Sequence, residues 1–173
     1  MNKYIESTHR WLKEVVVCKN LCPFAKAPLE NKSIEIVSCP NSNLIDTFAN
    51  ELEKLNEGKF ETTLIVLEDK STFEEFYNNF TSLEDMLEDN GLDQHFQLVA
   101  FHPKFVFQGL KPDDLANFVN RSPYPTVHIL KRSSFDQLDL NENTGEEISF
   151  ANERLLKSLP KEEFQRLFPW AKP

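Results

Sequence analysis

Hydrophobic residues recur at helical spacing in several segments of the chain, with charged and polar residues between them. Over Tyr4–Val17 the apolar positions fall every three or four residues, which predicts an amphipathic helix. The same spacing predicts a second helix over Asn43–Asn56. Ser71 or Thr72 can cap a third helix, which Gly91 ends. The N-terminal half of the chain therefore alternates amphipathic helices with shorter segments of another pattern.

Those shorter segments predict four β-strands. Ser33–Ser38 ("SIEIVS") alternates apolar and polar residues, as a half-buried strand does. Thr62–Leu67 ("TTLIVL") is a continuous β-branched run, which is typical of a central strand covered on both faces. Phe96–Pro103 and Pro125–Lys131 predict the third and fourth strands.

The order of the elements predicts the fold class. Strands separated by helices of about 12 to 18 residues imply crossover connections. "KPDDLANFVN" predicts a short helix before the fourth strand, and Glu146–Ser158 and Lys161–Phe168 predict two more after it. We therefore expect an α/β (or α+β) fold, a single-domain sandwich of about four mixed strands covered by helices, N-terminal helix first, over residues 1–173. Ferredoxin-like and thioredoxin-like arrangements both fit, and the strand order stays open.

Composition narrows the classes of function. The 173 residues are 40% hydrophobic and include fifteen phenylalanines, enough for one core without disulfides or a structural metal. The net charge of −9 disfavours binding to nucleic acid. No apolar run approaches the roughly 20 residues that span a bilayer, and no signal-peptide stretch opens the chain, so we expect a cytoplasmic protein with no membrane partner. Its three cysteines are then expected to be reduced.

Cys22 is the first candidate for chemistry. Pro23 follows it, which disfavours helical dihedral angles at Cys22 and permits a new helix to start there. As an N-cap, Cys22 would be favoured as a thiolate by free amides and by Lys26. The alternative is a simply buried thiol, as most free cysteines are. Cys18 could pair with Cys22 in a disulfide or a metal site, although the spacing is not that of a zinc knuckle, and Cys39 is expected to be a packing residue.

Two histidines occupy strand positions. His102 is in phase with Leu98, and His128 with Leu130. If the third and fourth strands are neighbours, both imidazoles can face one cleft and act as general acid or base. Two alternatives stay open: hydrogen-bonded core residues, or ligands of zinc or iron together with Cys22.

The segment "NRSPYP" (Asn120–Pro125) places an arginine beside two prolines. The prolines stiffen the backbone, and a cis bond at Pro125 is compatible with the sequence. A guanidinium held on a stiff turn is a device for gripping carboxylate or phosphate oxygens. Alternatively, Arg121 pairs with Asp113 or Asp114 for structural reasons alone.

The segments "NLCPFA", "TTL", "FHPKFVF" and "DDLANFVNRSPYPTVHIL", and the last residue of "SFAN" before "ERL", match a known pattern in order and spacing. Through them the chain resembles domain-of-unknown-function family 1415, whose members are mostly bacterial. The resemblance covers Trp11 to about Leu159 and implies a set of important positions but no reaction. Cys18 lies outside that set, which weakens a Cys18–Cys22 pair. The positions, called the signature residues below, are Asn20, Cys22, Pro23, Phe24, His102, Pro103, Asn117, Asn120, Arg121, Ser122, Pro123, Tyr124, Pro125 and His128.

These residues support a hypothesis of an enzyme that acts on a small anionic molecule. Cys22 would be the nucleophile or redox thiol, with His102 or His128 as general base or acid. No metal or other cofactor is assigned, and no oligomeric state is predicted. The rival hypothesis is a non-catalytic module that binds a ligand or a metal in the same cleft. The residues expected to bind the anion are Asn120, Arg121, Ser122, Tyr124 and Lys26.

Overall fold

The computed structural model describes residues 2–135 and 144–171. A four-stranded mixed sheet with the order β1-β2-β4-β3 lies at its centre. β1 and β2 are parallel, and β4 is antiparallel to both of its neighbours. The predicted mixed α/β fold is confirmed, and β2 lies inside the sheet as its β-branched run predicted. The strands are β1 (Ile34–Cys39), β2 (Thr62–Leu67), β3 (Phe96–Phe101) and β4 (Thr126–Lys131).

The long helices follow the predicted periodicity. The first predicted helix is present, but its second half widens into a π-helical segment, η1. The third begins with a capping box in which Thr72 and Glu75 bond to each other's backbone amides. The helical elements are α1 (Lys3–Trp11), η1 (Leu12–Val17), α2 (Lys26–Glu30), η2 (Asn41–Asn43), α3 (Leu44–Asn56), α4 (Phe73–Asp89), η3 (Leu115–Asn120), η4 (Arg132–Ser134), α5 (Thr144–Ser158) and α6 (Lys161–Leu167).

The short helix before β4 differs from its prediction. It is a 3₁₀ segment, η3, and it begins at Leu115, later than the proline at 112 suggested. The Asp114 side chain accepts a hydrogen bond from the Ala116 amide at 2.9 Å and so caps the segment at this point. The residues between β3 and η3 instead form an irregular connection, which side-chain bonds to its backbone hold in place.

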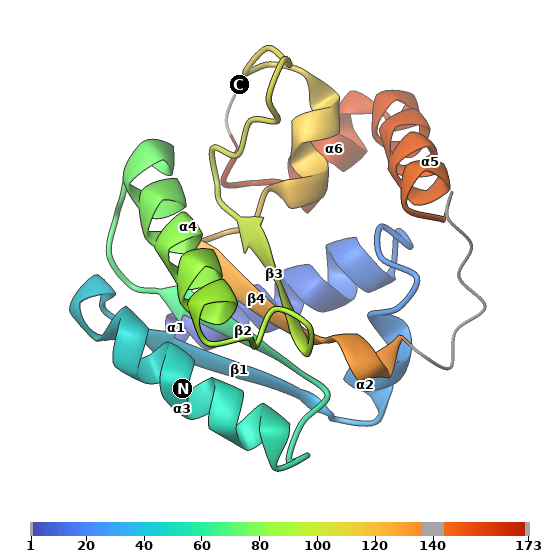
Figure 1. Cartoon of the computed structure of the whole chain (residues 1–173). Coiled ribbons are helices and arrows are strands. Elements are labelled where there is room, and N and C mark those ends of the chain that lie inside the picture. Colours follow the sequence, from blue (N-terminus) through green and yellow to red (C-terminus); the bar gives the residue numbers. More distant parts are fainter. Residues whose placement is uncertain (1, 136–143, 172–173) are drawn as a thin grey trace.

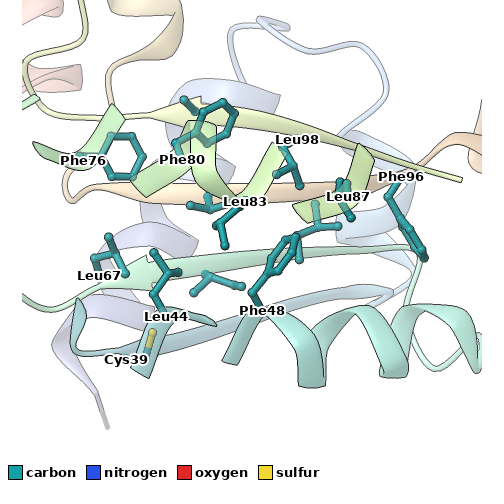
Figure 2. Packing of buried hydrophobic residues seen from close by; sticks show 14 of the residues in the cluster. Cys39, Leu44, Phe48, Leu67, Phe76, Phe80, Leu83, Leu87, Phe96 and Leu98 are labelled. Atoms are coloured by element: carbon teal, nitrogen blue, oxygen red, sulfur yellow. The ribbon is translucent and has the colours of Figure 1, made fainter. Parts of the chain in front are cut away.

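α3 and α4 cover one face of the sheet (Figure 1). Between them and the sheet lies a cluster of buried side chains that includes Phe48 of α3, Phe76 of α4, Ile65 of β2 and Ile129 of β4. Figure 2 shows phenylalanine and leucine side chains from both helices meeting over the strands. Five buried phenylalanines contribute large aromatic area to this cluster: Phe48, Phe76, Phe80, Phe96 and Phe105.

α1 and η1 pack on the opposite face, together with residues of α5 and α6. This second cluster contains Trp11, Leu64 and Leu156, and the C-terminal Phe168 lies 5.1 Å from Phe118, ring centre to ring centre. The aromatic residues near the C-terminus therefore pack on the body of the fold. Among the described residues, no helix has both the length and the apolar composition needed to cross a membrane.

Candidate functional site: a cavity on the second face of the sheet

A cavity of about 500 Å³ opens on the sheet face that carries α1 and η1. Its floor comes from β2, β4 and β3, where Leu64, His128 and Val99 lie side by side in register and point to the same face. Its walls come from η1, residues 21–28 and the first turns of α5. Most lining side chains are aliphatic or aromatic. The polar ones are Cys22, Glu61, Thr62, Asn120, His128, Lys131, Ser134, Ser149 and Asn152.

Cys22 lies at this cavity in a turn and not at the start of a helix. The Ala25 amide bonds to the Cys22 carbonyl at 3.2 Å, and α2 starts only at Lys26. Burial raises the pKa of the Cys22 thiol, and hydrogen bonds from the Phe24 and Ala25 amides oppose that rise without cancelling it. The local geometry therefore favours the protonated thiol at neutral pH.

His128 lines the cavity floor as a neutral imidazole. Burial lowers its pKa to about 4. Its Nε2 lies 2.6 Å from Oγ1 of Thr62, and that hydroxyl donates its single proton to the Ile129 carbonyl at 2.7 Å. The hydroxyl must therefore accept from Nε2, which assigns the ring proton to Nε2 and leaves a lone pair on Nδ1.

Two asparagines contribute side-chain amides to the cavity wall. Asn120 donates from Nδ2 to the Ala100 carbonyl at 3.1 Å. Asn152, on α5, is only 4% exposed and donates from Nδ2 to the Leu21 carbonyl at 2.7 Å. Asn152 was not among the candidate site residues, although the resemblance included it as the last residue of "SFAN"; that was the one signal that could have found it.

His102 lies on the opposite face of the sheet from His128. Because His128 pairs with Val99, and position 102 is an odd number of residues further along, the two imidazoles point away from each other. His102 stacks on Phe76 at 5.4 Å, and its Nδ1 accepts from the Lys104 amide at 3.0 Å. The expectation that both histidines share one cleft is wrong, although the two strands are neighbours as it required.

Arg121 bonds to backbone carbonyls and does not form the expected clamp beside the cavity. Its Nε donates to Phe105 at 3.1 Å and its Nη2 to Pro112 at 2.6 Å, and its guanidinium lies 4.2 Å from the centre of the Phe118 ring. These bonds tie the irregular connection to η3. Within the described chain, neither Asp113 nor Asp114 forms an ion pair with it. The Pro125 peptide bond is trans.

The remaining predicted anion-binding residues also lie outside the cavity lining. Buried Ser122 donates to the Tyr124 carbonyl, and the Tyr124 ring packs against Tyr4 at 4.7 Å. Lys26 is exposed, and its Nζ lies 4.0 Å from Oε1 of Glu30. Of the predicted site residues, the structure therefore brings together Cys22, Asn120 and His128 only, and their chemical roles stay predictions.

A metal site has no support in the geometry. All three cysteines are free thiols: Cys18 is exposed, Cys22 half-buried and Cys39 buried. Within residues 2–135 and 144–171, no group of three or more His, Cys, Asp or Glu side chains is placed to hold a metal ion. Since His102 and His128 face opposite ways, they cannot join Cys22 in one coordination sphere.

Replacing Arg121 with methionine is expected to lower the free energy of unfolding by about 2 kcal/mol, because two carbonyls lose a charged donor. Binding in the cavity should stay unchanged, since Arg121 does not line it. Urea denaturation measures the first effect, and Arg154→Met, an exposed arginine on α5, is the matched control. Unchanged stability in Arg121→Met would contradict the structural role.

Searches of curated proteins and of solved structures found no match. A family model described as "Protein of unknown function (DUF1415)" matches residues 3–166. That match spans the whole sheet and every helical element except the last residue of α6, so the chain belongs to the DUF1415 family.

Proposed function

We propose that this protein binds a small, mainly apolar molecule in the cavity formed by β2, β4, β3, η1 and α5. The observation that carries the proposal is the cavity itself. Its volume of about 500 Å³ is in the range of small-molecule sites, and its lining is mostly aliphatic and aromatic with a few polar groups. This is the composition that buries a ligand's apolar body and orients one polar end.

The charges around the cavity favour this proposal over the anionic substrate expected from the sequence. Arg121 and Lys26 do not line it. Lys131 does, but its Nζ donates to the Leu55 carbonyl at 3.3 Å, and the carboxylate of Glu61 lies in the same lining. Because Leu55 belongs to the core on the opposite face of the sheet, the ammonium of Lys131 points away from the cavity, and the other charged residue in the lining is acidic.

Catalysis by Cys22 is the weaker candidate. A nucleophilic cysteine needs a lowered pKa, whereas burial raises the pKa of this thiol. His128 has a pKa of about 4, and its Nε2 donates a hydrogen bond to Thr62 and not to the Cys22 sulfur. Cys22 and His128 therefore fit a binding role, in which a polarisable sulfur and a neutral imidazole line an apolar cavity.

Titration with N-phenyl-1-naphthylamine, a neutral dye that fluoresces in apolar surroundings, tests the proposal. We expect saturable fluorescence at one dye per chain. Val99 points into the cavity beside His128, so Val99→Trp should fill part of it and weaken dye binding about tenfold or more. Val106→Trp, at a half-buried position outside the lining, is the control and should bind normally.

Absence of saturable binding by the wild-type chain would contradict the proposal. Equal binding by Val99→Trp and wild type, with both chains folded by circular dichroism, would show that the dye binds somewhere other than the cavity. Either result would favour the alternative hypothesis, in which Cys22 acts as a nucleophile or redox thiol.

A further inference from the structure

We infer that the cavity selects neutral molecules that carry an O–H or N–H donor on an apolar body, and that Nδ1 of His128 and Oδ1 of Asn152 receive that donor. The inference rests on the proposed function, because it specifies the ligand of the same site. It follows from the hydrogen bonds of two residues in the lining, His128 and Asn152, each of which has its donor bonded to the protein and an acceptor atom left over.

The tautomer of His128 supplies the first acceptor. Its Nε2 donates a hydrogen bond to Oγ1 of Thr62, because the Thr62 hydroxyl donates its own proton to the Ile129 carbonyl. Within the described part of the chain, the side-chain hydrogen bond of His128 is made at Nε2 and none reaches Nδ1. The ring belongs to the cavity floor, between Leu64 and Val99, so this lone pair is available to a ligand.

Asn152 supplies the second acceptor. The bond from Nδ2 to the Leu21 carbonyl fixes which end of the amide is the nitrogen, since a carbonyl requires a donor. Its Oδ1 has no donor among residues 2–135 and 144–171, and the side chain is more than nine-tenths buried on the cavity wall. Asn120 is arranged the same way, with Nδ2 bonded to the Ala100 carbonyl and no described donor on Oδ1.

These acceptors decide what kind of polar end can bind. A carboxylate or phosphate oxygen is itself an acceptor, so it forms no hydrogen bond with Nδ1 of His128 or Oδ1 of Asn152 and adds the desolvation of a charge. The imidazole cannot supply a positive charge near neutral pH, because its pKa is about 4. A hydroxyl or an amine N–H instead satisfies an acceptor that is otherwise left to water. The site therefore discriminates by hydrogen-bond polarity and not by charge attraction.

A matched series of naphthalenes tests the inference by calorimetry or by displacement of N-phenyl-1-naphthylamine at pH 7. 2-Naphthol carries a donor, 2-methoxynaphthalene has the same ring without it, and 2-naphthoate carries an anion. We expect 2-naphthol to bind about tenfold tighter than 2-methoxynaphthalene, the factor of one hydrogen bond, and at least as much tighter than 2-naphthoate.

Two variants test which acceptors are responsible. His128→Phe retains a ring but removes Nδ1, and Asn152→Ala removes Oδ1; each should reduce the preference for 2-naphthol over 2-methoxynaphthalene several-fold while 2-methoxynaphthalene still binds. The comparison of the three ligands on the wild-type chain needs no variant, so it tests the preference for a donor group even if a variant does not fold.

The outcomes separate the two proposals. Equal affinity for 2-naphthol and 2-methoxynaphthalene, or tighter binding of 2-naphthoate, would overturn the inference while the proposed function stands. Failure of the dye and of all three naphthalenes would overturn the proposed function itself.

Discussion

Lowering the pH from 7 to 5 is expected to reduce the free energy of unfolding by about 3 kcal/mol, because buried His102 and half-buried His128 remain neutral in the folded chain. Burial lowers the pKa of both His102 and His128 to about 4, whereas an unfolded histidine titrates near 6.5. Between these values the unfolded chain binds protons that the folded chain does not, so stability falls as the pH falls. The stabilisation is complete above about pH 6.5 and is lost progressively towards pH 4.

Urea denaturation at pH 7 and pH 5 measures this difference, and variants assign it. His102→Gln should remove about half of the pH-dependent change, because His102 is 2% exposed and packs on Phe76. His95→Gln, at an exposed position before β3, is the control and should leave the change intact. A wild-type stability that is flat from pH 7 to pH 5 would contradict the placement of the two imidazoles.

Much of the fold could be predicted from sequence because its strands and long helices have unambiguous periods. "TTLIVL" has no polar break, and that is why β2 could be placed inside the sheet before any coordinates. Register could not be predicted in this way. Whether His102 and His128 share a face depends on which residues pair across β3 and β4, and a shift of one residue reverses the answer.

The candidate site was predictable only in part, because catalytic residue types also serve as scaffold. Asn117 is fully buried: its Oδ1 accepts from the Phe107 amide at 2.9 Å and its Nδ2 donates to the Lys111 carbonyl at 2.7 Å. Arg121 and His102 bond to the backbone in the same region. No sequence pattern distinguishes an arginine that grips backbone carbonyls from one that grips a substrate.

The signature residues therefore fall into two groups with different roles. Cys22, Asn120 and His128 line the cavity. The other group satisfies backbone groups in the long connection from β3 to β4, and consists of His102, Asn117, Arg121 and Ser122. Asn120 joins that group to the cavity, since its backbone carbonyl accepts from the His102 amide while its side chain lies on the wall. The connection has few regular hydrogen bonds of its own, so polar side chains must supply them.

Alkylation by iodoacetamide at pH 8 is expected to modify Cys18 faster than Cys22, because a raised thiol pKa lowers the fraction of reactive thiolate. Burial raises the pKa of Cys22 and also restricts access to its sulfur, whereas Cys18 is exposed. Cys39 is buried and should react only when the chain unfolds. Mass spectrometry of variants that retain a single cysteine gives the three rates separately.

The same measurement relates Cys22 to the cavity and decides between binding and catalysis. N-Phenyl-1-naphthylamine should slow alkylation of Cys22, which lines the cavity, and leave Cys18, which does not, unaffected as an internal control. A nucleophilic cysteine behaves in the opposite way: it reacts fastest of the three and still reacts at pH 6, because its thiolate persists there. Rapid modification of Cys22 at pH 6 would therefore restore the enzyme hypothesis, since the amides of Phe24 and Ala25 would then outweigh burial at the sulfur.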